Sequence, residues 1–133
     1  MVLDTTFCID AMREYRSGRK GPALLMLDRL GDTPLAIPIF VLCELMAGAQ
    51  MAVNPGLELR RVERFAELGD VLIPDRAFAA LYGEAEAHLR RRGLGVATRD
   101  LLIGVAAKAV GQPLLTRNRR HFDRIPGLVV EVY

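Results

Sequence analysis

The feature that most constrains the fold is a series of very short aliphatic runs, each separated from the next by a segment with helical spacing. Runs of two to five such residues are too short to form helices and are typical of buried strands. Strands that alternate with helices predict an α/β fold with a short, mostly parallel central sheet flanked by helices. The five runs are Val2–Leu3, Leu35–Ile39, Val71–Ile73, Leu114–Leu115 and Leu128–Val132.

Turn residues and apolar spacing predict where the helices lie between these strands. Asp75 and Thr98 are expected as N-caps. The apolar segment 40–49 is expected to be a fully buried helix, and 71–73 a buried strand. We expect helices over 7–17, 22–30, 40–49, 57–68, 76–92 and 101–110, and a polar turn over 117–123.

The length and composition indicate one domain, residues 1–133, with a substantial core, since 51% of the residues are hydrophobic. No apolar run approaches the roughly 20 residues of a membrane-spanning helix. An acid at position 4 and no basic segment before it make a secretory signal unexpected. Cys8 and Cys43 stand among apolar neighbours, which predicts buried free thiols in the reduced cytoplasm.

Three acidic residues stand at positions where an acid needs an explanation. Asp4 follows the first strand, where it either faces a ligand crevice or caps the next helix. Glu44 is the one charge in the apolar helix 40–49, where burial costs several kcal/mol unless an arginine or a metal ion neutralises it. Asp100 lies in the first turn of another apolar helix, where the helix dipole alone favours an acid by about 0.3–1 kcal/mol.

These three acids converge if the helices bring them to the carboxyl edge of the sheet. Clustered carboxylates repel one another unless a cation neutralises them. Oxygen ligands favour Mg²⁺ or Mn²⁺, and a metal-bound water can attack a phosphodiester. The sequence therefore suggests a metal-dependent phosphodiesterase site.

The segment after Thr116, at the end of another strand, is rich in basic residues. Such a cluster beside an acidic pocket suits contacts with phosphate groups, and a solvated loop is the alternative explanation. A net charge of +2 does not by itself indicate a nucleic-acid ligand. His121 is not expected to be a catalytic base, because nothing in the sequence identifies a partner that orients it. The basic residues are Arg117, Arg119, Arg120, His121 and Arg124.

Four motifs in this order resemble those of PIN-domain proteins and, more narrowly, of VapC-type toxins of bacterial type II toxin–antitoxin systems. The resemblance extends from residue 2 to about residue 130. Each motif is weak alone, and their order and intervals carry the match. They are Leu3-Asp4-Thr5; Cys43-Glu44-Leu45 followed by Ala47-Gly48; Arg99-Asp100-Leu101-Leu102-Ile103; and Leu115-Thr116-Arg117-Asn118 followed by His121 to Leu128.

The resemblance implies a single PIN-like domain acting as a Mg²⁺-dependent endoribonuclease. It also implies a homodimer and a VapB-type antitoxin whose C-terminal segment enters the active-site groove. Asp4 and Asp100 would be the metal ligands, with Glu44 completing the acidic site directly or through a water.

Thr116 and Asn118 match positions on the far side of the pocket. Many PIN domains carry a fourth acid in this segment, and Asn118 adds no charge there. We therefore expect one Mg²⁺ (Mn²⁺ as a substitute) and leave a second ion open. Arg117, Arg119 and Arg120 are expected to bind RNA.

Two alternatives stay open: a PIN-like RNA-binding or regulatory module with little catalysis, and a nuclease acting on single-stranded DNA. Two other classes with an acid after the first strand do not fit. A haloacid-dehalogenase-like phosphatase needs a second Asp at position 6, which is Thr6. A receiver domain needs a late Lys after a strand, and neither Lys20 nor Lys108 follows one.

Overall fold

A computed structural model describes all residues, 1–133, and contains one sheet of five strands. Every neighbouring pair of strands is parallel, in the order β3-β2-β1-β4-β5. The predicted α/β fold with a parallel sheet is therefore confirmed. The strands are β1 (Val2–Leu3), β2 (Ala36–Pro38), β3 (Asp70–Leu72), β4 (Leu114–Leu115) and β5 (Val130–Glu131).

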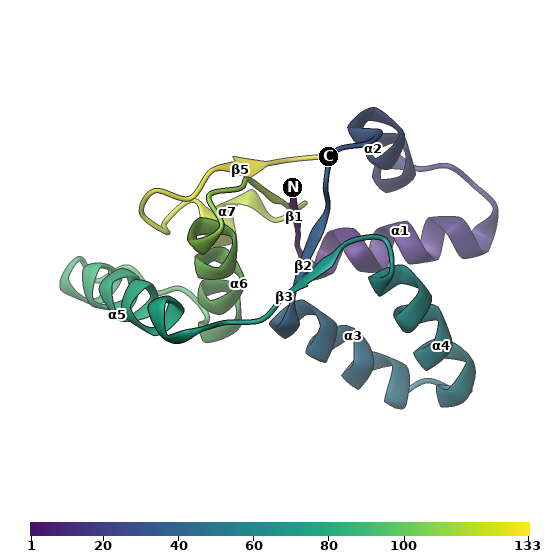
Figure 1. Cartoon of the computed structure of the whole chain (residues 1–133), viewed down its shortest axis with the longest axis horizontal. Helices are drawn as coiled ribbons and strands as arrows, with labels where there is room; N and C mark the ends of the chain where they lie inside the picture. The colour runs from purple at the N-terminus through teal and green to yellow at the C-terminus, as the bar shows by residue number, and fades with distance from the viewer.

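Seven helices surround the sheet and fall into two groups (Figure 1). The first four lie on one side, where α1 packs against α2, α3 and α4, and the last three lie on the other, where α6 packs against α5 and α7. None of them has the length and apolar character that crossing a membrane requires. The helices are α1 (Thr5–Ser17), α2 (Pro22–Leu30), α3 (Ile39–Gln50), α4 (Pro55–Ala66), α5 (Arg76–Arg91), α6 (Thr98–Ala109) and α7 (Arg119–Phe122).

The core lies around β1 and β4, which occupy the middle of the sheet and are fully buried. Strand β3 is different, because it is an edge strand that pairs only with β2. Its residues are half-buried or exposed, and Ile73 just beyond it is 76% exposed. The expectation of a buried strand at 71–73 is therefore wrong.

Helix α3 is apolar on nearly every side but is buried on only one. Val41, Leu45 and Ala49 face the core at the helical spacing of four residues. Cys43 points away from this face and is exposed, whereas Cys8 is buried. The prediction of a fully buried helix is thus wrong, because the other face of α3 borders solvent. The prediction of a buried thiol is confirmed for Cys8 and wrong for Cys43.

The end of the chain is held by packing rather than by a polar turn. Residues 119–122 form the short helix α7, and Phe122 within it is 1% exposed. Gly104 allows this segment to approach α6, since a Cβ there would lie 2.4 Å from Ile125 Cδ1 and 3.5 Å from Phe122 Cδ1. The basic segment is therefore anchored to α6 by its one aromatic residue.

Of the two residues predicted to cap helices, Asp75 does so and Thr98 does not. Asp75 does cap α5, accepting a hydrogen bond of 3.0 Å from the backbone N–H of Phe78. Thr98 does not cap α6, because the helix already begins at Thr98 and Ala97 occupies the cap position. This start places Asp100 third in the helix, within its first turn.

Candidate active site

Asp4 lies directly after β1, at the carboxyl edge of the sheet, and is only 4% exposed. Its side chain makes no capping bond to α1, so capping does not explain it. Instead Oδ2 accepts hydrogen bonds of 2.7 Å from the hydroxyls of Thr6 and Thr116. No residue donates to Oδ1, and since no buried side-chain oxygen lacks a partner, Oδ1 is the oxygen that reaches the surface.

Glu44 lies in the second turn of α3, which starts where β2 ends. Both carboxylate oxygens have partners: Arg99 donates to Oε1 at 2.6 Å, and the Thr5 hydroxyl donates to Oε2. The side chain is 21% exposed, so it is not enclosed by apolar neighbours as expected. The arginine that would neutralise it is present, on the same helical turn as Asp100.

Asp100 is partly buried and lies within the electrostatic influence of the other two acids. Burial raises the pKa of Asp100 above its ordinary value, and the charges of Asp4 and Glu44 raise it further, against the opposing effect of His121. His121 Nδ1 lies 3.1 Å from Asp100 Oδ2. His121 therefore has the partner that the sequence did not identify, and the expectation that nothing orients it is wrong.

The donor set fits a hard divalent cation. Asp4 Oδ1 and Asp100 Oδ1 both lack hydrogen-bond partners, whereas both oxygens of Glu44 are engaged. No three acidic, histidine or cysteine side chains are close enough to form a complete protein cage for a metal. Such an arrangement suits a divalent cation that binds through one or two carboxylates and keeps several of its waters.

Thr116 and Asn118 form the opposite side of this edge, after β4. Thr116 is fully buried, and its hydroxyl both donates to Asp4 and accepts the backbone N–H of Asn118 at 3.0 Å. One threonine thus connects the start of the loop after β4 to the acid after β1. Asn118 lies in this loop, half-buried.

The three arginines predicted to bind RNA differ in their surroundings. Arg117 is bonded to Asp10 at 2.6 Å, and Arg119 to Asp123 at 3.1 Å. Arg120 is exposed and belongs to no ion pair, so its whole guanidinium is available to a ligand.

Asp10 and Thr6 are part of this region and were missed from the sequence. Thr6 bonds Asp4, and Asp10 lies one helical turn later, 4% exposed and bonded to Arg117. The available signal was an acid four residues after Thr6 within the apolar stretch 7–12.

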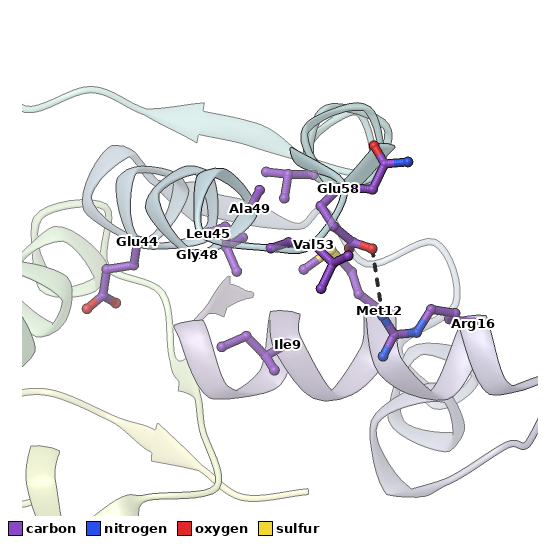
Figure 2. Close-up of a pocket in the computed structure, with 12 residues that line it drawn as sticks. Ile9, Met12, Arg16, Glu44, Leu45, Gly48, Ala49, Val53 and Glu58 are labelled. Atoms are coloured by element: carbon purple, nitrogen blue, oxygen red, sulfur yellow. Dashed lines mark ion pairs between the residues drawn. The ribbon is translucent and has the colours of Figure 1, made fainter. Parts of the chain in front are cut away.

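An apolar groove leads away from Glu44 between α1, α3 and α4 (Figure 2). Its volume is about 460 Å³. Glu44 lies at one end, and Arg16 and Glu58 form an ion pair of 3.7 Å at the other. The walls between them are Ile9, Met12, Leu45, Gly48, Ala49, Ala52, Val53 and Val62.

The comparison with protein families gives one match, a PIN domain over residues 1–128. Among curated proteins, the tRNA(fMet)-specific endonucleases VapC of Shigella flexneri and Salmonella typhimurium are both 32% identical over 130 residues. The match covers 98% of this chain and 95% of each relative. Ribonuclease VapC2 of Rickettsia felis is 27% identical with the same coverage.

Solved structures agree with this result. The DNA-bound VapBC complex of Salmonella typhimurium contains a chain that matches with a TM-score of 0.87 and 30% identity. A chain of VapBC2 from Rickettsia felis, bound to a promoter DNA fragment, matches with a TM-score of 0.88 and 26% identity. Each match covers 98% of this chain and 96% of the other.

Proposed function

The chain belongs to the PIN domain family, among its VapC-type endonucleases, and from this premise we propose that it is the toxin of a type II toxin–antitoxin system. In this role it is an endoribonuclease that hydrolyses RNA phosphodiester bonds and is neutralised by a VapB-type antitoxin. The observation that carries the proposal is that Asp4 and Asp100, both at the carboxyl edge of the sheet, are bonded within the chain through Oδ2 only, so that each keeps an oxygen for a ligand. Carboxylates with free oxygens at one sheet edge add little to the stability of the fold, whereas a metal-dependent nuclease needs them as ligands.

Asp4 and Asp100 are the proposed ligands of one Mg²⁺, through the oxygens that no residue of the chain occupies. When bound, the ion would supply an acidified water for attack on the phosphodiester. Glu44, held by Arg99 and Thr5, is placed to accept a hydrogen bond from a water or to reach the ion. Asn118 contributes a neutral oxygen to the same edge.

Arg117, Arg119 and Arg120 are proposed to bind the RNA backbone. All three follow β4 at the edge where Asp4 lies, so a strand bound along them passes the acidic site. Their guanidinium groups provide the paired donors that phosphate oxygens accept.

The apolar groove beside Glu44 is the proposed seat of the antitoxin segment. It runs between α1, α3 and α4 and ends at Glu44, so a segment bound in it would reach an acid of the site. Val53 at its rim is fully exposed, and burying such a side chain stabilises a complex by roughly 1.5–3 kcal/mol. A homodimer, action in the cytoplasm and a single domain over residues 1–133 belong to the same proposal.

Cleavage of a mixed RNA pool by the purified protein tests the proposal. We expect cutting with Mg²⁺, none with EDTA and none by Asp100→Asn, while Asp28→Asn, an exposed acid bonded to Lys20, cuts like the wild type. Cutting of single-stranded DNA instead of RNA would indicate the DNA nuclease. No cutting of either, together with no Mg²⁺ binding in a titration, would indicate a binding module.

A further inference from the structure

A second buried acid lies one helical turn from the proposed metal site. Asp10 on α1 has a side chain only 5% exposed, and it accepts three hydrogen bonds. Arg13 donates to Oδ1 at 2.6 Å, Arg117 donates to Oδ2 at 2.6 Å, and Tyr133 donates its phenol proton to Oδ2 at 2.9 Å. A carboxylate this buried and this fully bonded fixes the groups around it.

Tyr133 is itself held on two sides. Its ring packs edge-on against buried Phe7, with ring centroids 4.9 Å apart and an interplanar angle of 89°. Burial and the neighbouring Asp10 raise the pKa of Tyr133, so the phenol stays protonated and keeps donating. This bond joins the segment after β5 to α1, and it orients Asp10 Oδ2 toward Arg117.

Arg117 is the one member of this group that belongs to the loop after β4. Its backbone N–H lies 3.5 Å from Thr6 Oγ1, and Thr6 donates to Asp4 Oδ2. Its guanidinium gives one nitrogen, Nη1, to Asp10 and remains 56% exposed. Asp10, which binds the guanidinium, stands four residues after Thr6 on α1, a rise of about 6 Å along the helix.

We propose that Asp10 and Tyr133 are positioning residues that hold the Arg117 guanidinium about one helical turn of α1 from Thr6, the partner of Asp4, so that its remaining N–H groups bind a backbone phosphate of the RNA. The inference rests on the proposed function, because it takes RNA as the ligand. It separates Arg117 from Arg120, which is exposed and has no ion-pair partner to fix its guanidinium.

The proposal depends on the shape of the guanidinium. Arginine presents five N–H groups in a rigid fork, so one side can bind Asp10 while the other binds two phosphate oxygens. Lysine has a single nitrogen and cannot hold both partners in this way. Arg117→Lys should therefore retain the positive charge and still lose the contribution of Arg117 to RNA binding.

The test measures binding of a labelled single-stranded oligouridylate to the full chain in EDTA, with Asp100→Asn in every sample to prevent cleavage. A charge-assisted hydrogen bond contributes about 1.5–3 kcal/mol, so Arg117→Ala should weaken binding about tenfold or more. Asp10→Asn and Tyr133→Phe should weaken it severalfold. Asp28→Asn and Tyr15→Phe, at exposed positions, are the matched controls and should leave binding unchanged.

A double-mutant cycle distinguishes positioning from a general structural role. If Asp10 acts through Arg117, Asp10→Asn should change binding less than about twofold once Arg117→Ala is present. If Asp10→Asn weakens RNA binding as much with Arg117→Ala as without it, the proposal is wrong. Unchanged RNA binding by Arg117→Ala, or wild-type binding by Arg117→Lys, would overturn it as well. Thermal unfolding shows which variants are folded. If Asp10→Asn does not fold, Arg117→Lys still tests the proposal, because it leaves the buried Asp10 unchanged.

Cleavage of the RNA pool with Mg²⁺, without the Asp100 substitution, separates the two failures. If the wild type cuts RNA and Arg117→Ala cuts it with the same KM and kcat, the inference alone is wrong. If the wild type neither binds the oligouridylate nor cuts the pool, the proposed function fails and the inference with it.

Discussion

Replacing Asp4 by Asn tests the metal site without knowledge of the RNA target. In the wild type, Oδ2 accepts two hydroxyl protons, and Oδ1 has no partner in the chain. Asparagine keeps an acceptor for Thr6 and Thr116 and places an amide NH₂ where Oδ1 was. The side chain therefore keeps its place in the fold and loses its charge and its free oxygen.

The cost to the metal-free protein follows from the two hydrogen bonds. Bonds to a charged group contribute about 1.5–3 kcal/mol and neutral ones about 0.5–1.5 kcal/mol, so the exchange costs about 1 kcal/mol for each bond. Loss of the repulsion between Asp4 and Asp100 offsets part of this. We expect the free energy of unfolding to fall by at most about 2 kcal/mol, within the 5–15 kcal/mol typical of a domain.

The assay is thermal unfolding with EDTA and with increasing Mg²⁺. A ligand that binds only the folded state adds about 2.7 kcal/mol of stability at a hundred times its Kd. The wild type and Asp28→Asn should therefore gain stability with Mg²⁺, and Asp4→Asn should gain none. Equal stabilisation of Asp4→Asn, or no stabilisation of the wild type, would refute the assignment of Asp4 as a ligand. A loss well above about 2 kcal/mol in EDTA would show that Asp4 is mainly structural.

Three further predictions concern the same edge of the sheet. The pKa of Asp100 in the folded state is raised above the ordinary value of 3.8, so the folded state binds more protons than the unfolded state when the pH lies between these two pKa values. The stability of the protein should therefore fall as the pH rises from the unfolded-state pKa through the folded-state pKa. Asp100→Asn should lack this fall and be at least as stable as the wild type at neutral pH in EDTA, measured by urea unfolding; a clearly less stable variant would indicate a structural cap. Arg120→Ala and Arg119→Ala should each reduce the slope of log affinity for RNA against log salt by about 0.7, and an unchanged slope would place the RNA path elsewhere. Phe122→Ala should cost about 3–5 kcal/mol of stability by calorimetry, because it empties a fully buried site under the basic segment; a loss below 1 kcal/mol would contradict that anchoring.

The elements of the fold could be predicted because their signals are local. Two aliphatic residues followed by Asp4 mark a strand end, and Asp75 three residues before Phe78 marks a helix start. Which side of an element is covered is not a local property. Helix α3 shows this, because its composition is apolar throughout while Cys43 faces solvent.

In the candidate site, too, some residues could be predicted from local sequence signals and some contacts could not. Asp4, Glu44 and Asp100 could be proposed because strand ends and helix starts meet at one edge of a parallel sheet. The contacts of Asp10 with Arg117 and of His121 with Asp100 join residues 107 and 21 positions apart. No spacing rule relates such positions, since the fold of the loop after β4 decides both contacts.

Glu44 is where the structural and the functional explanations compete most directly. Its ion pair with Arg99 exists, which by itself favours the structural explanation. However, the Arg99 side chain is 75% exposed, and an ion pair this accessible contributes at most about 1 kcal/mol. Against this small gain, the charge of Glu44 adds to the effects that raise the pKa of Asp100, after burial and the charge of Asp4. The ion pair alone is therefore a weak reason for a carboxylate at position 44, and the cation proposed for this edge would be a stronger one.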